Sequence, residues 1–82
     1  MSHHPFTEKQ TRDLAHYLTV RPEALRRLSR MHRQNHIALM LAALDLMTIQ
    51  QIRFCANGAG VNLPDTDDRK VLIEQIRCQL MG

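Results

Sequence analysis

Residues 37–58 read IALMLAALDLMTIQQIRFCANG, and this stretch decides what kind of fold the chain forms. At helical spacing its first half places apolar side chains on two opposite faces. One face comprises Ile37, Met40, Leu41, Leu44 and Met47, and the other comprises Leu39, Ala42, Ala43 and Leu46. A helix that is apolar on all sides is buried on all sides. Cover is therefore needed for both faces of this helix.

The length of the chain limits where that cover can come from. A chain of 82 residues forms one small domain with a marginal core. Small domains gain stability from disulfides, a metal or oligomerisation. The two cysteines, Cys55 and Cys78, form no CxxC motif and no Cys/His cluster, so neither a disulfide framework nor a metal site is indicated. We therefore expect a second subunit to cover the other face, in an intertwined homodimer built on a central apolar helix.

Local signals predict an all-α chain of four to five short helices. Thr7 and Gln10 fit a capping box at the first helix, and 57–60, with its Asn and two Gly, is the clearest stop. An open alternative is that the helices expected over 35–44 and 46–57 are continuous. The expected helices run from Thr7 to about Leu18, from Pro22 through the arginine-rich segment, over about 35–44, over 46–57 with Asp45 as cap, and onward from the acidic segment 64–68.

Neither the N-terminus nor the apolar run indicates a signal peptide or a membrane-spanning helix. The N-terminus is polar, and the apolar run before Asp45 is shorter than the roughly 20 residues that span a bilayer. We expect a cytoplasmic protein with reduced thiols. Residues 1–6 are expected to be a flexible N-terminus, and 7–82 a single helical dimerisation and regulator domain.

Positive charge is concentrated in the first half of the chain. Residues 1–35 carry seven basic and three acidic residues, whereas 36–82 carry four basic and five acidic residues. A basic half suggests a polyanion or an acidic partner, although a solvated helix face is the competing interpretation. Segment 13–28, DLAHYLTVRPEALRRL, also has the spacing of a helix-turn-helix, with Ala15 as the small residue between the helices. Such spacing is common in helical proteins, so a plain helical scaffold remains the alternative.

Enzymatic chemistry is not indicated. No nucleophile–base set, phosphate-binding glycine loop or catalytic carboxylate pair occurs, and we expect no enzyme. His32 and His36 share a helix face but lack a third ligand nearby, so we interpret them as surface histidines and expect no cofactor. Two function classes remain, a DNA-associated regulator and a small helical chaperone or adaptor with no DNA role.

The block Leu41-Ala42-Ala43-Leu44-Asp45-Leu46, followed by an apolar helix and a turn with Asn57, resembles FlhD-like transcriptional activator subunits. The upstream element Leu14-Ala15-x-x-Leu18-x-Val20 and the Asp-led helix 67–76 are also similar to that family. The resemblance covers roughly residues 13–77. This family includes the flagellar regulator and short relatives on conjugative plasmids and integrating elements.

The resemblance implies a transcriptional activator subunit. Such subunits are all-helical homodimers that assemble with a zinc-containing FlhC-like partner, bind double-stranded promoter DNA and recruit RNA polymerase at flagellar or conjugative-transfer genes. Zinc is then expected in the partner and not in this chain. The expected dimer interface comprises Ile37, Leu39, Met40, Leu41, Ala43, Leu44 and Leu46. The candidate DNA-binding residues are Arg26, Arg27, Arg30, Arg33, Arg53, Arg69 and Lys70.

Overall fold

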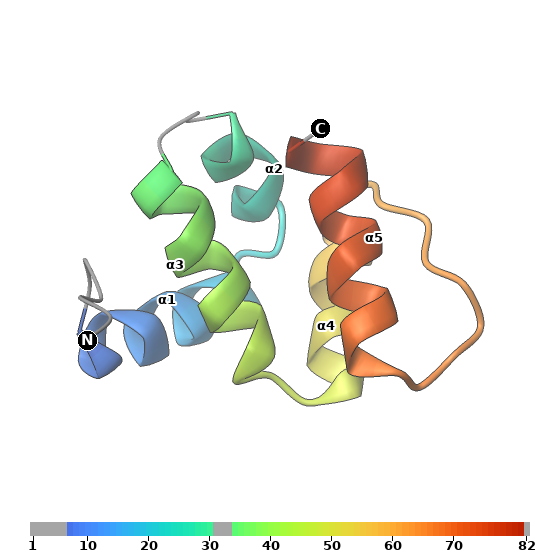
Figure 1. Cartoon of the computed structure of the whole chain (residues 1–82), viewed down its shortest axis with the longest axis horizontal. Coiled ribbons are helices and arrows are strands. Elements are labelled where there is room, and N and C mark those ends of the chain that lie inside the picture. Colours follow the sequence, from blue (N-terminus) through green and yellow to red (C-terminus); the bar gives the residue numbers. More distant parts are fainter. Residues whose placement is uncertain (1–6, 31–33, 82) are drawn as a thin grey trace.

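The computed structural model of the chain describes residues 7–30 and 34–81 (Figure 1). The prediction of an all-α chain of four to five short helices is confirmed over these ranges, which contain no β-strand. Segment 1–6, which we expected to be flexible, lies outside the described residues. The helices are α1 (Glu8–Val20), α2 (Ala24–Ser29), α3 (Gln34–Asp45), α4 (Ile49–Gly58) and α5 (Arg69–Met81).

Reciprocal capping boxes begin α1 and α4. The Thr7 hydroxyl accepts the Gln10 backbone N–H at 3.2 Å, and the Gln10 side chain accepts the Thr7 N–H at 2.7 Å, as predicted. Thr48 and Gln51 repeat this arrangement at 3.2 and 2.9 Å. The prediction that Asp45 caps the fourth helix is therefore wrong, because Asp45 is the last residue of α3 and Thr48 satisfies the free amides of α4. The alternative of one continuous helix is wrong for the same reason.

The end of α4 and the start of α5 follow the sequence signals. α4 ends at Gly58, and Gly60 adopts a φ of 75°, a left-handed conformation that glycine tolerates without strain. The Asp68 carboxylate accepts the backbone N–H groups of Lys70 and Val71 at 3.0 and 3.4 Å. Thus the acidic segment before α5 supplies its cap, as expected.

The helix-turn-helix spacing does not produce that motif. Pro22, predicted as the first residue of the second helix, lies in the turn before α2, which has only 6 residues. A Cβ placed on Gly58 would lie 2.6 Å from the Cβ of Pro22, so this turn packs tightly on the end of α4. α1 and α2 each pack chiefly on α3. The scaffold alternative therefore describes this segment.

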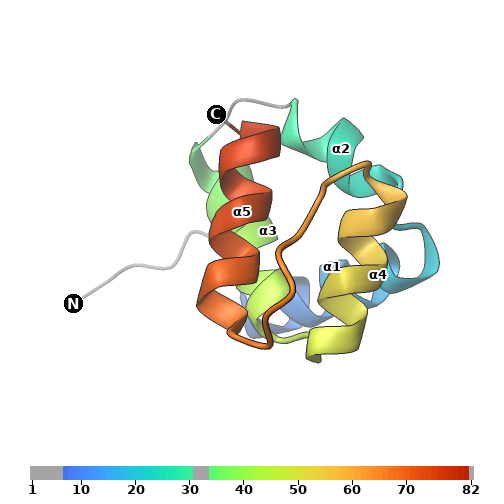
Figure 2. The same cartoon turned by 90° about the vertical axis from the view of Figure 1, so that its right-hand side faces the viewer.

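The core forms where α3 meets α1, α2 and α5, with α4 packed against α1 and α5 (Figures 1 and 2). α3 thus obtains much of its cover from helices of the same chain. Most of the apolar side chains in the core of the chain have no solvent exposure. The buried apolar residues are Leu18, Ala24, Leu25, Met40, Ala43, Leu44, Met47, Ile52, Cys55, Ala56, Ala59, Val61, Leu72 and Ile76.

Candidate nucleic-acid and subunit interfaces

A group of arginines is exposed on and beside α2. The helix buries Ala24, Leu25 and Ser29 against the core, so helical spacing turns its basic side chains outward. Glu23 is the one acidic residue within 21–30, which makes this region strongly positive. We call these residues the α2 arginine cluster: Arg21, Arg26, Arg27 and Arg30, all exposed.

Members of this cluster differ in how they are held. Arg26 Nε donates to the Ala59 carbonyl oxygen at 2.8 Å, which ties α2 to the end of α4. Arg27 Nη2 donates to the exposed Tyr17 hydroxyl at 3.1 Å. Arg30 makes no side-chain hydrogen bond to another described residue. Arg21 and Arg30, which make no such bond, and Arg27, whose bond is to an exposed hydroxyl, are therefore more available for an anion than Arg26, which has a structural role as well.

Arg53 on α4 is mainly a structural residue. It is half-buried, and its Nη2 donates to the carbonyl oxygens of Pro64 and Thr66. On the other side of the same connecting segment, the Gln79 amide pairs with the backbone N–H and carbonyl of Asn62 at 3.2 and 2.8 Å. These contacts fix the extended connection between α4 and α5, so Arg53 is a poor candidate for a DNA contact.

Arg53→Met is expected to lower the free energy of unfolding by about 1–2 kcal/mol, because charge-assisted hydrogen bonds to two carbonyls are lost. The matched control is Arg69→Met, which removes the same charge from an exposed residue that makes no side-chain hydrogen bond among the described residues. The control should change stability by no more than about 0.5 kcal/mol. Urea unfolding followed by circular dichroism measures both values, and equal losses would contradict the assigned role of Arg53.

The other candidate DNA contacts do not join the α2 arginine cluster in one surface. Arg69 and Lys70 are exposed at the start of α5, at the bottom of Figure 1, whereas α2 lies at the top near the other end of α5. Figure 2 shows the same separation. Arg33 lies outside the described residues. The structure therefore groups only part of the predicted set.

The predicted dimer-interface residues are divided between the core and the surface. Met40, Ala43 and Leu44 have no solvent exposure and belong to the core of the chain itself. Other helices of the same chain cover these three side chains, so their place in a subunit interface stays a prediction. Leu46 is 53% exposed. The half-exposed members are Ile37, Leu39 and Leu41.

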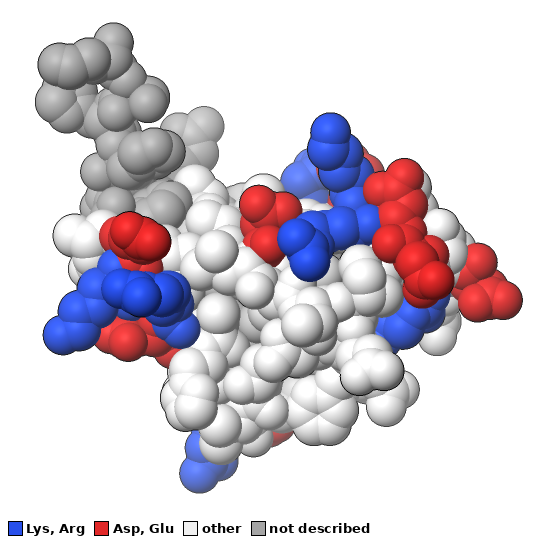
Figure 3. Space-filling view, turned by 90° about the horizontal axis from the view of Figure 1, so that it is seen from below, with Lys and Arg blue, Asp and Glu red and all other residues white. Residues whose placement is uncertain are grey.

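Further apolar side chains are exposed that the sequence analysis did not select. Val20 at the end of α1 is 64% exposed and Phe54 on α4 is 53% exposed. Figure 3 shows broad uncharged surface between groups of charged side chains on the lower face. The sequence did contain a signal for Phe54. Ile52 and Cys55 are three positions apart and define the buried face of α4, so helical spacing turns Phe54 away from that face.

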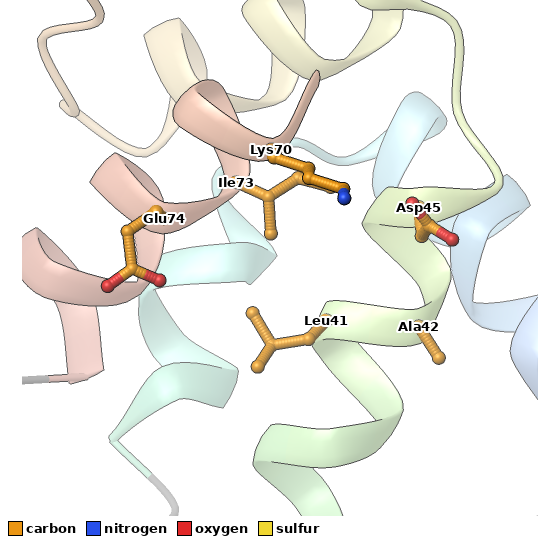
Figure 4. A pocket seen from close by; sticks show the side chains of 6 residues that line it. All are labelled: Leu41, Ala42, Asp45, Lys70, Ile73 and Glu74. Atoms are coloured by element: carbon orange, nitrogen blue, oxygen red, sulfur yellow. The ribbon is translucent and has the colours of Figure 1, made fainter. Parts of the chain in front are cut away.

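An open groove separates α3 from α5. Its volume is about 440 Å³, and Figure 4 shows Leu41 and Ile73 facing each other across it. Charged side chains stand at its rim, with Asp45 on α3 and Lys70 and Glu74 on α5. The apolar floor with a charged rim suits a protein surface better than a small polar ligand. The lining residues are Leu41, Ala42, Asp45, Lys70, Ile73 and Glu74.

Both cysteines are free thiols in different environments. Cys55 is fully buried, and its S–H donates to the Leu18 carbonyl oxygen at 3.3 Å, with Met47 Sδ at 3.8 Å. Burial raises the pKa of Cys55 to about 11. Cys78 is exposed on α5, beside Glu74. Cys55 is therefore a thiol of the core, and a low-pKa reactive thiol is not present at that position.

Over the described ranges, no group of three or more His, Cys, Asp or Glu side chains is arranged to hold a metal ion. His36 is half-buried at the start of α3, and His32 lies outside the described residues. No helix in the described part of the chain has the length and apolar character required to cross a bilayer. No family model, curated protein or solved structure matches the chain.

Proposed function

We propose that the chain is a helical subunit of a DNA-binding transcriptional activator. It homodimerises, assembles with an FlhC-like zinc-containing subunit in the cytoplasm, binds promoter DNA and recruits RNA polymerase at flagellar or conjugative-transfer genes. The observation that supports this most directly is the α2 arginine cluster, a compact set of exposed cations with one acidic neighbour. The resemblance of the LAAL block to activator subunits supports it independently.

The cluster suits phosphate contacts better than base recognition. α2 has 6 residues, which is too short to lie along the major groove as a recognition helix. Exposed arginines can instead neutralise DNA phosphates, which strengthens and positions binding without selecting a sequence. The partner subunit would then supply most of the base-specific contacts. In this arrangement Arg27 and Arg30 contact DNA, while Arg26 and Arg53 hold the fold.

The homodimer uses the part of α3 that the chain itself leaves uncovered. Leu46 is largely exposed, and Leu39 and Leu41 are half-exposed. Because the core closes within one chain, two folded copies can pack side by side through these residues, and intertwining of the chains is not required. Burial of each large apolar side chain contributes up to about 1.5–3 kcal/mol.

The double variant Arg27→Gln/Arg30→Gln is expected to weaken binding to a labelled duplex and to reduce the slope of log K against log salt by about 2. A mobility-shift titration at several salt concentrations measures that slope. The control Lys9→Gln/Arg12→Gln removes the same two charges from α1 and should leave the slope unchanged. An unchanged slope in the first variant would exclude these arginines as phosphate contacts.

Co-expression with the product of the adjacent open reading frame tests the assembly. We expect a Cys-rich, zinc-containing partner that copurifies with the chain and gives the complex its promoter selectivity. A secretion substrate at that position, with no DNA binding by either protein, would instead favour the chaperone or adaptor alternative. The exposed apolar side chains and the α3–α5 groove are compatible with that second function, whereas the α2 arginine cluster favours the first.

A further inference from the structure

Two opposite charges face the α3–α5 groove without an ion pair. Asp45 lies on the α3 wall and Lys70 on the α5 wall, and both are exposed. Figure 4 shows Lys70 extended over the mouth of the groove towards the end of α3. Among the described residues, the ion pair is formed by Glu74 and Arg77, and neither Asp45 nor Lys70 has such a partner within 4.0 Å. The Arg77 hydrogen bond lowers the pKa of Glu74, so that carboxylate is already engaged.

The position of each charge also disfavours it within its own helix. Asp45 is the last residue of α3, where the helix dipole is negative and a cation would be preferred. Lys70 is in the first turn of α5, where the dipole is positive and an anion would be preferred. Neither charge therefore serves the stability of the isolated chain. Each would gain from an opposite charge brought to it by a second molecule.

We propose that the α3–α5 groove is the surface through which two copies of the chain pair, with Asp45 of each copy against Lys70 of the other. In a two-fold interface the same patch meets itself, so a patch that carries one unpaired anion and one unpaired cation on opposite walls is self-complementary. The two ion pairs would flank Leu41, Ala42 and Ile73, whose apolar surface becomes buried. This inference rests on the homodimer of the proposed function, shares Leu41 with the α3 surface named there, and extends that surface to α5.

An attraction between Asp45 and Lys70 within one chain is the main competing account. Both side chains are exposed, and an ion pair between exposed side chains contributes little to stability. It would also leave the apolar floor of the groove open to water. A foreign helix could cover the floor, but nothing would then require opposite charges on the two walls. The experiment separates these cases by testing whether the two charges complement each other between molecules.

The test uses two single variants, Asp45→Lys and Lys70→Glu. With Asp45→Lys both unpaired charges on the groove walls are positive, and with Lys70→Glu both are negative, in addition to Glu74, which Arg77 already pairs. Each variant should therefore repel a copy of itself. Like charges placed opposite one another at an interface are unfavourable, so we expect self-association to weaken about tenfold or more. An equimolar mixture restores both opposite-charge pairs, and we expect it to form a one-to-one heterodimer. Sedimentation velocity and native mass spectrometry measure both effects.

Folding does not confound this test. Lysine at the end of α3 and glutamate in the first turn of α5 both suit the helix dipoles, so each variant should still fold as a monomer and unfold cooperatively. Any fall in unfolding temperature that comes from the lost dimer should depend on protein concentration. The controls are Asp67→Lys and Arg69→Glu, which make the same charge changes at neighbours that do not line the groove. Both controls should dimerise like the parent chain.

Each result decides a different question. A parent chain that is monomeric at micromolar concentration would overturn both the homodimer and this inference. A dimeric parent whose two groove variants also dimerise would overturn the groove alone and leave the proposed function standing. Monomeric variants that fail to pair in the mixture would show that the two charges do not meet. A loss of thermal stability without any change in association would assign the charges to a pair within one chain.

Discussion

Leu44→Ala is expected to remove much of the free energy that keeps this chain folded. Leu44 has no solvent exposure, and it lies on α3, which packs against α1, α2 and α5. Truncation of a buried leucine costs about 2–5 kcal/mol, because transfer energy is lost and a cavity remains. At typical values per residue, a domain of this size has roughly 4–12 kcal/mol of stability in total. The variant should therefore be partly unfolded at physiological temperature.

The neighbouring leucine provides the control for that result. Leu46 is 53% exposed two positions further along, so Leu46→Ala should change the stability of the monomer by no more than about 0.5 kcal/mol. Thermal and urea unfolding at several protein concentrations measure both variants. For Leu46 a loss that grows with protein concentration would report on the dimer. A Leu44 variant as stable as the parent would contradict the described packing of α3.

Local signals in the sequence located most helix boundaries because the interactions that set them are local. Thr7 and Gln10 satisfy each other's backbone groups within one turn, so residue identity and spacing were sufficient. The same signal was present at Thr48 and Gln51, where we instead selected the acidic residue that came first in the chain. A Thr-x-x-Gln pattern weighed equally at both places would have located the start of α4.

Longer-range contacts could not be predicted in this way. Periodicity indicated that α3 is apolar all round, but it could not show which face the other helices of the chain cover. Helical spacing puts Ala43 and Leu46 on one face, yet Ala43 is fully buried while Leu46 is exposed, because three other helices of the chain pack on α3. The structural role of Arg26 depends on a carbonyl 33 positions away in the sequence, which no local pattern contains.

The stability of the chain is expected to fall as the pH rises from about 9 to about 11, because of Cys55. Its thiol loses its proton at about pH 9.0 in the unfolded chain, whereas burial raises the pKa to about 11 in the folded chain. Between these values the folded chain holds a proton that the unfolded chain has released, so unfolding becomes more favourable as pH rises. The contribution of the buried thiol is complete below pH 9.

The expected loss reaches at most about 1.4 kcal/mol per pH unit over this window. Urea unfolding at a series of pH values measures this loss, with Cys55→Ala as the comparison. Both proteins carry Cys78→Ala, so they differ only in the presence of the Cys55 thiol. The other ionisable groups are the same in both proteins, so the difference between the two slopes isolates Cys55. Cys55→Ala should start from a lower stability and lose less of it above pH 9. Parallel slopes would mean that the Cys55 thiol is accessible to water in the folded chain, contrary to its position between Leu18 and Met47.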